Sequence, residues 1–232
     1  MSGLRNLGNT CYLNSGLQLL LSNDKFKEYF LINNFKSTKL NTIKDFIEEY
    51  IKSDIASPLK IVKMISNRKS IFGRGSQNDT SEFIIFLFDI IEEELKKEKK
   101  NNFLKDLYKL DVQTSIKCKV RSCLTISKTN YDDYFLFLDI PNDKSSLDLD
   151  DCYRLLKSKV KLEGDEMYYC EKCQEKRIAS KKIEISKWPD NLIVILKRFQ
   201  LRGSRYVKYT KNIDVPLFWR RGYELTSCVI HS

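Results

Sequence analysis

The stretch NLGNTCYLNS, residues 6–15, determines how the N-terminal half of the chain starts to fold. Asn and Gly before Cys11 favour a tight turn, and Thr10 or Asn9 can cap the helix predicted by the apolar residues that follow. A thiol in the first helical turn lies at the positive end of the helix dipole, which favours the reactive thiolate. Backbone amides there, together with a carboxamide such as Asn6, can hold an oxyanion. From this stretch alone, Cys11 can be a nucleophile, a metal ligand or a small buried residue.

Helical spacing of apolar residues dominates the first hundred positions. It predicts helices over residues 10–21 and 43–51, a helix with Pro58 as its first residue, and a buried helix over 80–95. Gly16, inside the first of these, indicates a place where another element approaches closely. The N-terminal part is therefore expected to be mostly helical.

The second part of the chain changes to alternating, β-branched and aromatic patterns typical of strands. One short helix is predicted over residues 145–157. Strands are predicted over 112–120, 129–141, 181–188, 191–200, 205–210 and 223–230. Helices followed by strands indicate the α+β class, with a helical half over 1–105 and a β-rich half over 106–232.

The composition excludes some functions and leaves others open. The chain has 232 residues, a net charge of +10 and no apolar run long enough to span a membrane. No secretory signal is visible, so an intracellular protein, cytoplasmic or nuclear, is expected. The densest basic cluster, Lys96–Lys100, follows Glu92–Glu94, which predicts a solvated helix end with ion pairs. The charge suits an acidic partner surface, but it forms no stripe along the sequence, so nucleic acid is not an expected partner.

Seven cysteines and one histidine limit the available chemistry. In a reducing compartment an odd number of cysteines favours metal sites and separate thiols over a disulfide framework. Cys152 and Cys228 fall among apolar residues, which predicts that both are part of the core. Any reaction that needs an imidazole has only His231 to use.

Two cysteine pairs predict a metal site. Cys170 and Cys173 form a CxxC motif, which alone also occurs in redox turns. Cys118 and Cys123 form a wider pair far upstream. Two such pairs predict a four-cysteine zinc ribbon between two hairpins, and the alternative is a pair of hairpin tips without metal.

Residues 76–86, SQNDTSEFIIF, combine structural and functional signals. Asp79 and Glu82 have the spacing of a capping box at the start of the buried helix. The same two carboxylates follow a glycine-containing loop, where a basic peptide could dock. Both roles are compatible.

Several blocks, in this order, resemble the ubiquitin-specific proteases, which are ubiquitin carboxyl-terminal hydrolases. GLRNLGNTCYLNSGLQLLL resembles the cysteine box of that family, and SQNDTSEFIIFL resembles its Gln-Gln-Asp-Ala-x-Glu-Phe block. FLFLDIP, GDEMYYCEKC and NLIVILKRF follow. The resemblance covers the whole chain. It implies a papain-like cysteine protease fold with thumb, palm and zinc-ribbon fingers, forming one catalytic domain that cleaves after the C-terminal glycine of ubiquitin.

The resemblance also implies roles for individual residues. Cys11 matches the nucleophile and Asn6 the oxyanion-hole carboxamide. Gln77, Asp79 and Glu82 match the block that contacts the basic C-terminal tail of ubiquitin. The structural Zn²⁺ ligands of the fingers match Cys118, Cys123, Cys170 and Cys173.

The resemblance departs from the family at the catalytic base. The family histidine lies in a Gly-His-Tyr motif, whereas His231 matches an earlier, non-catalytic position; the alternative is that His231 serves as a substitute base. The sequence therefore predicts an incomplete palm and a chain that is weakly active or inactive alone. We expect a monomer with ubiquitin or ubiquitinated proteins as partners and no membrane association. The alternatives are a non-catalytic ubiquitin-binding protein and, more remotely, a zinc-ribbon nucleic-acid binder.

Overall fold

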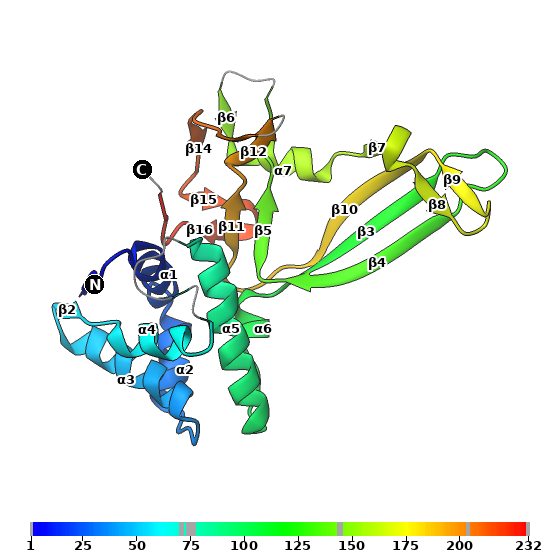
Figure 1. Ribbon diagram of the computed structural model, residues 1–232. Helices are drawn as coiled ribbons and strands as arrows, with labels where there is room; N and C mark the ends of the chain where they lie inside the picture. The colour runs from blue at the N-terminus through cyan, green and yellow to red at the C-terminus, as the bar shows by residue number, and fades with distance from the viewer. Residues whose placement is uncertain (1, 70–71, 73–77, 143–145, 203–204, 231–232) are drawn as a thin grey trace. The chain divides into compact units, whose positions relative to one another are not determined.

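The computed structural model describes residues 2–69, 72, 78–142, 146–202 and 205–230 (Figure 1). They fall into two compact units. The helical unit comprises Met1–Leu107 with Leu225–Ser232, and the strand unit comprises Tyr108–Glu224. The α+β class predicted from the sequence is confirmed, because helices dominate the first unit and strands the second.

The helical unit surrounds an apolar core. Its elements are β1 (Gly3–Leu4), α1 (Cys11–Leu21), α2 (Asp24–Ile32), α3 (Thr38–Lys52), β2 (Ile55–Ala56), α4 (Leu59–Ser66), α5 (Thr80–Lys97) and α6 (Phe103–Tyr108), which ends at the first residue of the strand unit. The side chains that are almost completely buried include Leu13, Leu20, Phe30, Leu40, Ile47, Ile61, Ile65, Phe83 and Phe88. Phe30 belongs to α2 and the others to helices that the sequence predicted, so burial of these apolar faces stabilises the unit.

The predicted helices are found with small changes at their ends. Pro58 is the N-cap of α4 and not its first residue, because its carbonyl accepts a hydrogen bond from the Val62 amide at 2.9 Å while its ψ of 15° lies outside the helical range. Helices α2 and α6 were not predicted. The signal for α2 was its N-cap, since the Asn23 side chain accepts a hydrogen bond from the Phe26 amide.

A buried carboxylate connects two helices of this unit. Glu94 of α5 is 7% exposed and accepts hydrogen bonds from Ser37 Oγ at 2.7 Å and from Lys39 and Lys97 Nζ, each at 2.9 Å. Burial by itself raises the pKa of Glu94, but these hydrogen bonds outweigh it and lower the pKa to about 2. Lys97 also pairs with Glu93 one turn earlier at 2.6 Å, which confirms the predicted ion pairing at this helix end.

The strand unit contains a long antiparallel sheet and several short pairs (Figure 1). Its elements are β3 (Leu110–Cys118), β4 (Ile126–Asp133), β5 (Phe135–Leu138), β6 (Leu147–Asp148), α7 (Leu149–Lys157), β7 (Val160–Leu162), β8 (Tyr168–Cys170), β9 (Glu175–Arg177), β10 (Ala179–Lys187), β11 (Ile193–Leu196), β12 (Phe199–Arg202), β13 (Arg205–Lys208), β14 (Ile213–Asp214), β15 (Phe218–Trp219) and β16 (Tyr223–Glu224). The long sheet has the strand order β4-β3-β10-β7, and the separate hairpin β8–β9 directly precedes β10 in the chain.

One apolar cluster forms the core of the strand unit. It packs α7 against β3, β5 and the later strands, and it contains Leu110, Val112, Leu136, Leu138, Ile140, Leu147, Leu149, Cys152, Tyr153, Tyr209 and Trp219. Burial raises the pKa of the Cys152 thiol. The prediction that Cys152 belongs to the core is therefore confirmed.

The structure corrects three predicted strands. Residues 129–141 and 191–200 each divide into two strands, because the halves pair with different partners: β4 with β3, β5 with β11, and β12 with β13. The predicted strand over 223–230 is wrong beyond Glu224, since no described strand lies beside residues 225–230 to complete a ladder. Cys228 is consequently exposed instead of part of the core.

None of the helices within the described ranges combines the length and apolar character needed to cross a bilayer.

Candidate active site and metal centre

Cys11 is the first residue of α1, and its side chain is exposed. The turn before it contains Gly8 and Asn9 with φ of +92° and +48°, the left-handed region that Gly adopts readily and Asn tolerates. Thr10 lies at the N-cap, but its side chain does not cap the helix as predicted. In the described residues the first amides of α1 therefore have no hydrogen bond from the N-cap side chain, which suits a site where these amides bind an anion.

The carboxamide of Asn6 is oriented by the same turn. Its Oδ1 accepts hydrogen bonds from the Gly8 amide at 3.0 Å and from Thr10 Oγ1 at 3.1 Å. Thr10 Oγ1 in turn accepts one from the Leu7 amide at 3.0 Å, which explains why it leaves the helix uncapped. Because the oxygen makes both bonds, the Nδ2 amide is the end of Asn6 that remains to donate to a ligand, as an oxyanion hole requires.

The N-terminus of α5 carries the predicted substrate-contact residues. Asp79 is the N-cap, and its Oδ1 accepts from the amides of Ser81 at 2.7 Å and Glu82 at 3.3 Å. Within the described chain the reciprocal half of a capping box is not formed, so Glu82 stays exposed in the first turn. The third predicted residue, Gln77, lies outside the described residues. One carboxylate therefore holds the helix end and the other faces solvent.

Helices α1 and α5 pack closely at Gly16. A Cβ atom added at Gly16 would lie 2.7 Å from Cδ1 of Phe83, closer than carbon atoms can approach. The neighbouring Tyr12 packs edge-on to the Phe83 ring and donates its hydroxyl hydrogen to the Phe72 carbonyl at 3.1 Å. The close approach predicted at Gly16 is confirmed, and it brings the helix of the candidate nucleophile against the helix of Asp79 and Glu82.

Two polar residues of α1 were not predicted to take part in the site. Asn14 Nδ2 donates to the Arg5 carbonyl at 3.2 Å, and Gln18 Nε2 donates to the Ser2 carbonyl at 2.8 Å. Both also line an open hollow of about 420 Å³ with Leu4, Ser15 and residues 227–230. The available signal was their spacing of three and seven residues from Cys11, which places them on one face of the helix.

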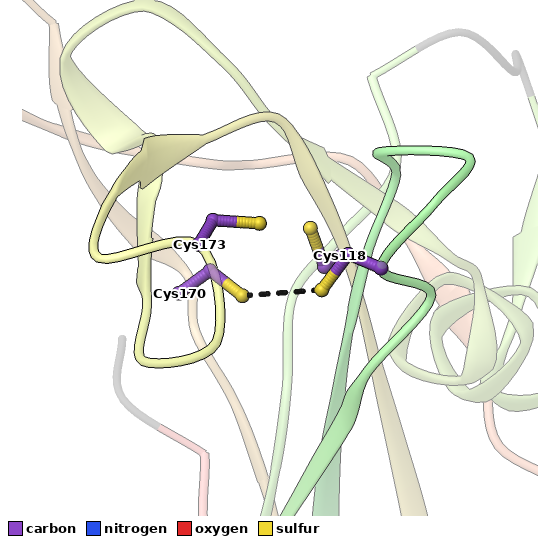
Figure 2. Close-up of side chains that lie close together, drawn as sticks. Cys118, Cys170 and Cys173 are labelled. Atoms are coloured by element: carbon purple, nitrogen blue, oxygen red, sulfur yellow. Dashed lines mark hydrogen bonds between the residues drawn. The ribbon is translucent and has the colours of Figure 1, made fainter.

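The four predicted metal ligands converge at the tips of two hairpins, and Figure 2 labels three of them, Cys118, Cys170 and Cys173. Cys118 ends β3 and Cys123 lies in the turn before β4, whereas Cys170 ends β8 and Cys173 lies in the turn before β9. All four sulfur atoms lie within 4.8 Å of one another, and those of Cys123 and Cys170 are 3.6 Å apart. The two-hairpin arrangement expected of a zinc ribbon is therefore present.

The pKa values of these thiols depend on one another and on neighbouring hydrogen bonds. Hydrogen bonds from the Thr125 hydroxyl and backbone lower the pKa of Cys123 to about 6. Burial and the neighbouring thiols Cys123 and Cys170 raise the pKa of Cys173 to about 12. Four thiolates at such distances repel one another, so they can ionise together only around a cation.

The dimensions of the cluster fit zinc. A tetrahedral Zn²⁺ with bonds of about 2.3 Å to sulfur places its ligands about 3.8 Å apart, close to the observed separations. Cys118 and Cys170 are buried, and Cys123 and Cys173 are half-buried, so the cluster is largely shielded from water. The residues present thus suit a closed, structural metal site.

The arrangement as a whole defines a class of protein. It is an α+β protein with an exposed cysteine at a helix N-terminus, an oriented carboxamide five residues earlier and four thiols at two hairpin tips that are positioned to bind a metal ion. The model of the ubiquitin carboxyl-terminal hydrolase family matches residues 2–232. The chain belongs to that family.

Similar proteins support the family and the fold. Ubiquitin carboxyl-terminal hydrolase 4 of Saccharomyces cerevisiae is 26% identical over 281 residues, with 96% of this chain and 30% of the relative covered. The protein of the same name from Vanderwaltozyma polyspora is 26% identical over 283 residues, with 96% and 32% covered. The chain thus spans about a third of the length of the curated relatives it matches.

A solved structure has the same fold. It is described as the SAGA Ubp8/Sgf11/Sus1/Sgf73 DUB module bound to ubiquitin aldehyde, and one of its chains matches with a TM-score of 0.76 at 24% identity. The match covers 94% of this chain and 52% of that chain. At this identity the likeness establishes the fold alone, and it agrees with the thumb, palm and fingers architecture expected from the sequence.

Proposed function

We propose that this chain is a deubiquitinating thiol hydrolase, which cleaves the isopeptide bond after the C-terminal glycine of ubiquitin. The observation that carries the proposal is the position of Cys11, exposed at the start of α1 beside uncapped amides. A thiol placed there lies close to donors that can stabilise the negative charge formed during acyl transfer. Family membership supplies the substrate class.

The proposed reaction follows the usual course of thiol hydrolases. The Cys11 thiolate attacks the carbonyl carbon of the ubiquitin glycine, and the tetrahedral oxyanion receives hydrogen bonds from Asn6 Nδ2 and the first amides of α1. Collapse of this intermediate expels the substrate lysine amine and leaves a thioester, which water then hydrolyses. A general base accepts the thiol proton and returns it to the leaving amine.

The other predicted residues take supporting roles in this proposal. Asp79 holds the start of α5, while the exposed carboxylate of Glu82, with Gln77, contacts the basic C-terminal tail of ubiquitin. A zinc ion bound by the four cysteines would cross-link the two hairpins and so stabilise the conformation in which they bind the body of ubiquitin.

The general base is the catalytic group with the weakest candidate among these 232 residues. Their only histidine is His231, which lies outside the described residues and outside any Gly-His-Tyr motif. General acid–base assistance contributes roughly 10²–10⁴-fold to such reactions. We therefore propose that the 232-residue chain by itself turns over slowly or not at all.

Purified 232-residue chain tests this proposal in two measurements. We expect binding of ubiquitin and covalent labelling of Cys11 by ubiquitin that carries a C-terminal vinyl electrophile, which intact-mass spectrometry detects and Cys11→Ala abolishes. With a fluorogenic ubiquitin substrate, we expect little turnover. Fast turnover that Cys11→Ala abolishes would contradict the weak-activity expectation, and absence of ubiquitin binding would overturn the proposed function.

The same experiment separates the second candidate, a non-catalytic ubiquitin-binding protein. The observation in its favour is that the single histidine, His231, lies outside any Gly-His-Tyr motif. Ubiquitin binding without labelling of Cys11 would support this candidate instead.

A further inference from the structure

The segment from Ser2 to Arg5, which leads into the Asn6 turn, is tied to two other parts of the helical unit. The amides of Gly3 and Arg5 donate to the carbonyls of Asp54 at 2.8 Å and Ala56 at 3.0 Å, which makes the short parallel pair β1–β2. This pairing satisfies the amides of Gly3 and Arg5. The carbonyls of Ser2 and Arg5 bind side chains of α1.

Two carboxamides of α1 bind those carbonyls. Gln18 Nε2 donates to the Ser2 carbonyl at 2.8 Å, and its Oε1 accepts from the Tyr50 hydroxyl at 2.7 Å, so its orientation is determined at both ends. Asn14 Nδ2 donates to the carbonyl of Arg5, the residue directly before Asn6, at 3.2 Å. Since Asn14 lies one turn after Cys11, it connects the helix of the nucleophile to the residue beside the candidate oxyanion donor.

Asn14 has a feature that stability does not explain. Its Oδ1 atom is buried, and in the described part of the chain it has no hydrogen-bond partner. A buried acceptor without a partner destabilises the folded state by an amount comparable to what one hydrogen bond contributes. An alanine at this position would lose one bond and remove one unsatisfied atom, with little net change in stability.

We propose that Asn14 is a positioning residue for the oxyanion hole, with Gln18 as its support. It holds the Arg5 carbonyl, and through the Arg5–Asn6 peptide it fixes the distance between the Cys11 sulfur and the Asn6 carboxamide. This inference rests on the proposed function, because it assigns a role within the same site. It predicts that Asn14 matters for stabilising the tetrahedral adduct and hardly matters for folding.

Ubiquitin aldehyde is the probe that isolates this role. Cys11 Sγ adds to the aldehyde carbon, the π electrons of the C=O bond move to oxygen, and the thiol proton ends on that oxygen, which gives a hemithioacetal without turnover. Its affinity therefore reports how well the oxygen is held, whereas unmodified ubiquitin reports only noncovalent docking.

The variants are Asn14→Ala and, as matched control, Asn41→Ala. Asn41 Nδ2 also donates to a backbone carbonyl, that of Phe35 at 2.9 Å, but it belongs to α3 and has no contact with the Asn6 turn. For Asn14→Ala we expect roughly 10-fold weaker binding of ubiquitin aldehyde, unchanged binding of unmodified ubiquitin and an unchanged melting temperature. For Asn41→Ala we expect a lower melting temperature and unchanged aldehyde binding.

Equal aldehyde affinity for Asn14→Ala and the wild type would overturn the inference. So would equal losses for aldehyde and unmodified ubiquitin, since those would indicate a general effect on docking.

If the wild type binds neither form of ubiquitin, that result counts against the proposed function but not against the positioning role. Hydrogen exchange then tests the positioning role without ubiquitin. Asn14→Ala should speed exchange of the Leu7 and Gly8 amides, whose acceptors are Thr10 and Asn6, by roughly 10-fold. Asn41→Ala should leave them unchanged. Exchange at wild-type rates in Asn14→Ala would contradict the positioning role.

Discussion

The helical unit and the tip of the long sheet are held together by different interactions. In the helical unit, apolar faces of α1, α3 and α5 are buried, and Glu94 adds a hydrogen-bonded anchor between α3 and α5. At the sheet tip, Leu124, Ile126, Val160 and Tyr169 are exposed, whereas Cys118 and Cys170 are buried and Cys123 and Cys173 half-buried. A hairpin tip with little apolar burial needs another source of stability, and a metal ion bound by the four cysteines would supply it. The two regions should therefore fail under different conditions.

Removal of the metal should have the largest effect and should act on the sheet tip alone. Structural zinc sites contribute on the order of 10 kcal/mol to the folding of small metal-dependent elements. We expect a chelator, or Cys170→Ser, to release one equivalent of zinc and to open the β8–β9 hairpin. Metal content and hydrogen exchange measure both effects.

The exposed Cys228 provides the matched control, because Cys228→Ser should leave the zinc content unchanged. Equal loss of protection in α1, α3 and α5 would contradict the independence of the two regions.

Acid should weaken the helical unit through Glu94. Its pKa falls from an ordinary 4.5 to about 2 on folding, which corresponds to roughly 3 kcal/mol. Because the folded pKa is the lower one, this stabilisation is fully present above about pH 4.5 and is lost as the pH falls through about 2. Denaturant unfolding between pH 7 and pH 2, followed by far-UV circular dichroism, measures the decline.

The decline should be shallower in Glu94→Gln. It should persist in Glu48→Gln, which removes a half-exposed carboxylate that pairs with Lys52 at 3.7 Å. Identical pH profiles for Glu94→Gln and the wild type would show that this anchor does not stabilise the unit.

Overpacking at Gly16 should produce the smallest of the three effects. In Gly16→Ala the new methyl group meets the Phe83 ring at 2.7 Å, so the buried ring or the two helices must shift. We expect a loss of roughly 1–2 kcal/mol, since strain outweighs the helix propensity gained from alanine. Thermal unfolding measures it, with Gly3→Ala as control because its Cβ would meet the nearest atom, the Asp54 carbonyl oxygen, at an ordinary 3.7 Å. A higher melting temperature for Gly16→Ala would contradict the close packing.

Elements with strong local signals were predictable, and elements that depend on partners were not. The spacing in residues 80–95 predicted α5, and the glycine before Cys11 predicted the turn. The segment 223–230 has the composition of a strand, yet only Tyr223–Glu224 pairs, because strand formation depends on a neighbour. A complete capping box joins Asp148, the N-cap of α7, to Asp151, whereas Asp79 and Glu82 form only half of one.

The candidate site divides in the same way. Cys11, Asn6 and the four clustered cysteines could be proposed from motifs, because the chemistry of such sites requires particular residue types at particular spacings. Asn14 and Gln18 could not, since nothing local indicates which carbonyls their amides will meet. Such partners lie up to sixteen residues away and become neighbours only when α1 packs beside the Ser2–Arg5 segment.

The sequence by itself determined the α+β class, the family resemblance, the helix that begins at Cys11 and the cysteine pairs. These features follow from residue types at short sequence separations, which set helix periodicity, turn formation and the spacing within each cysteine pair. Only the tertiary structure decided that four distant thiols meet within 4.8 Å, that Thr10 leaves α1 uncapped and that Asn14 keeps a buried oxygen without a described partner. These features depend on which residues become neighbours in space, and that is settled by packing and strand pairing rather than by order along the chain.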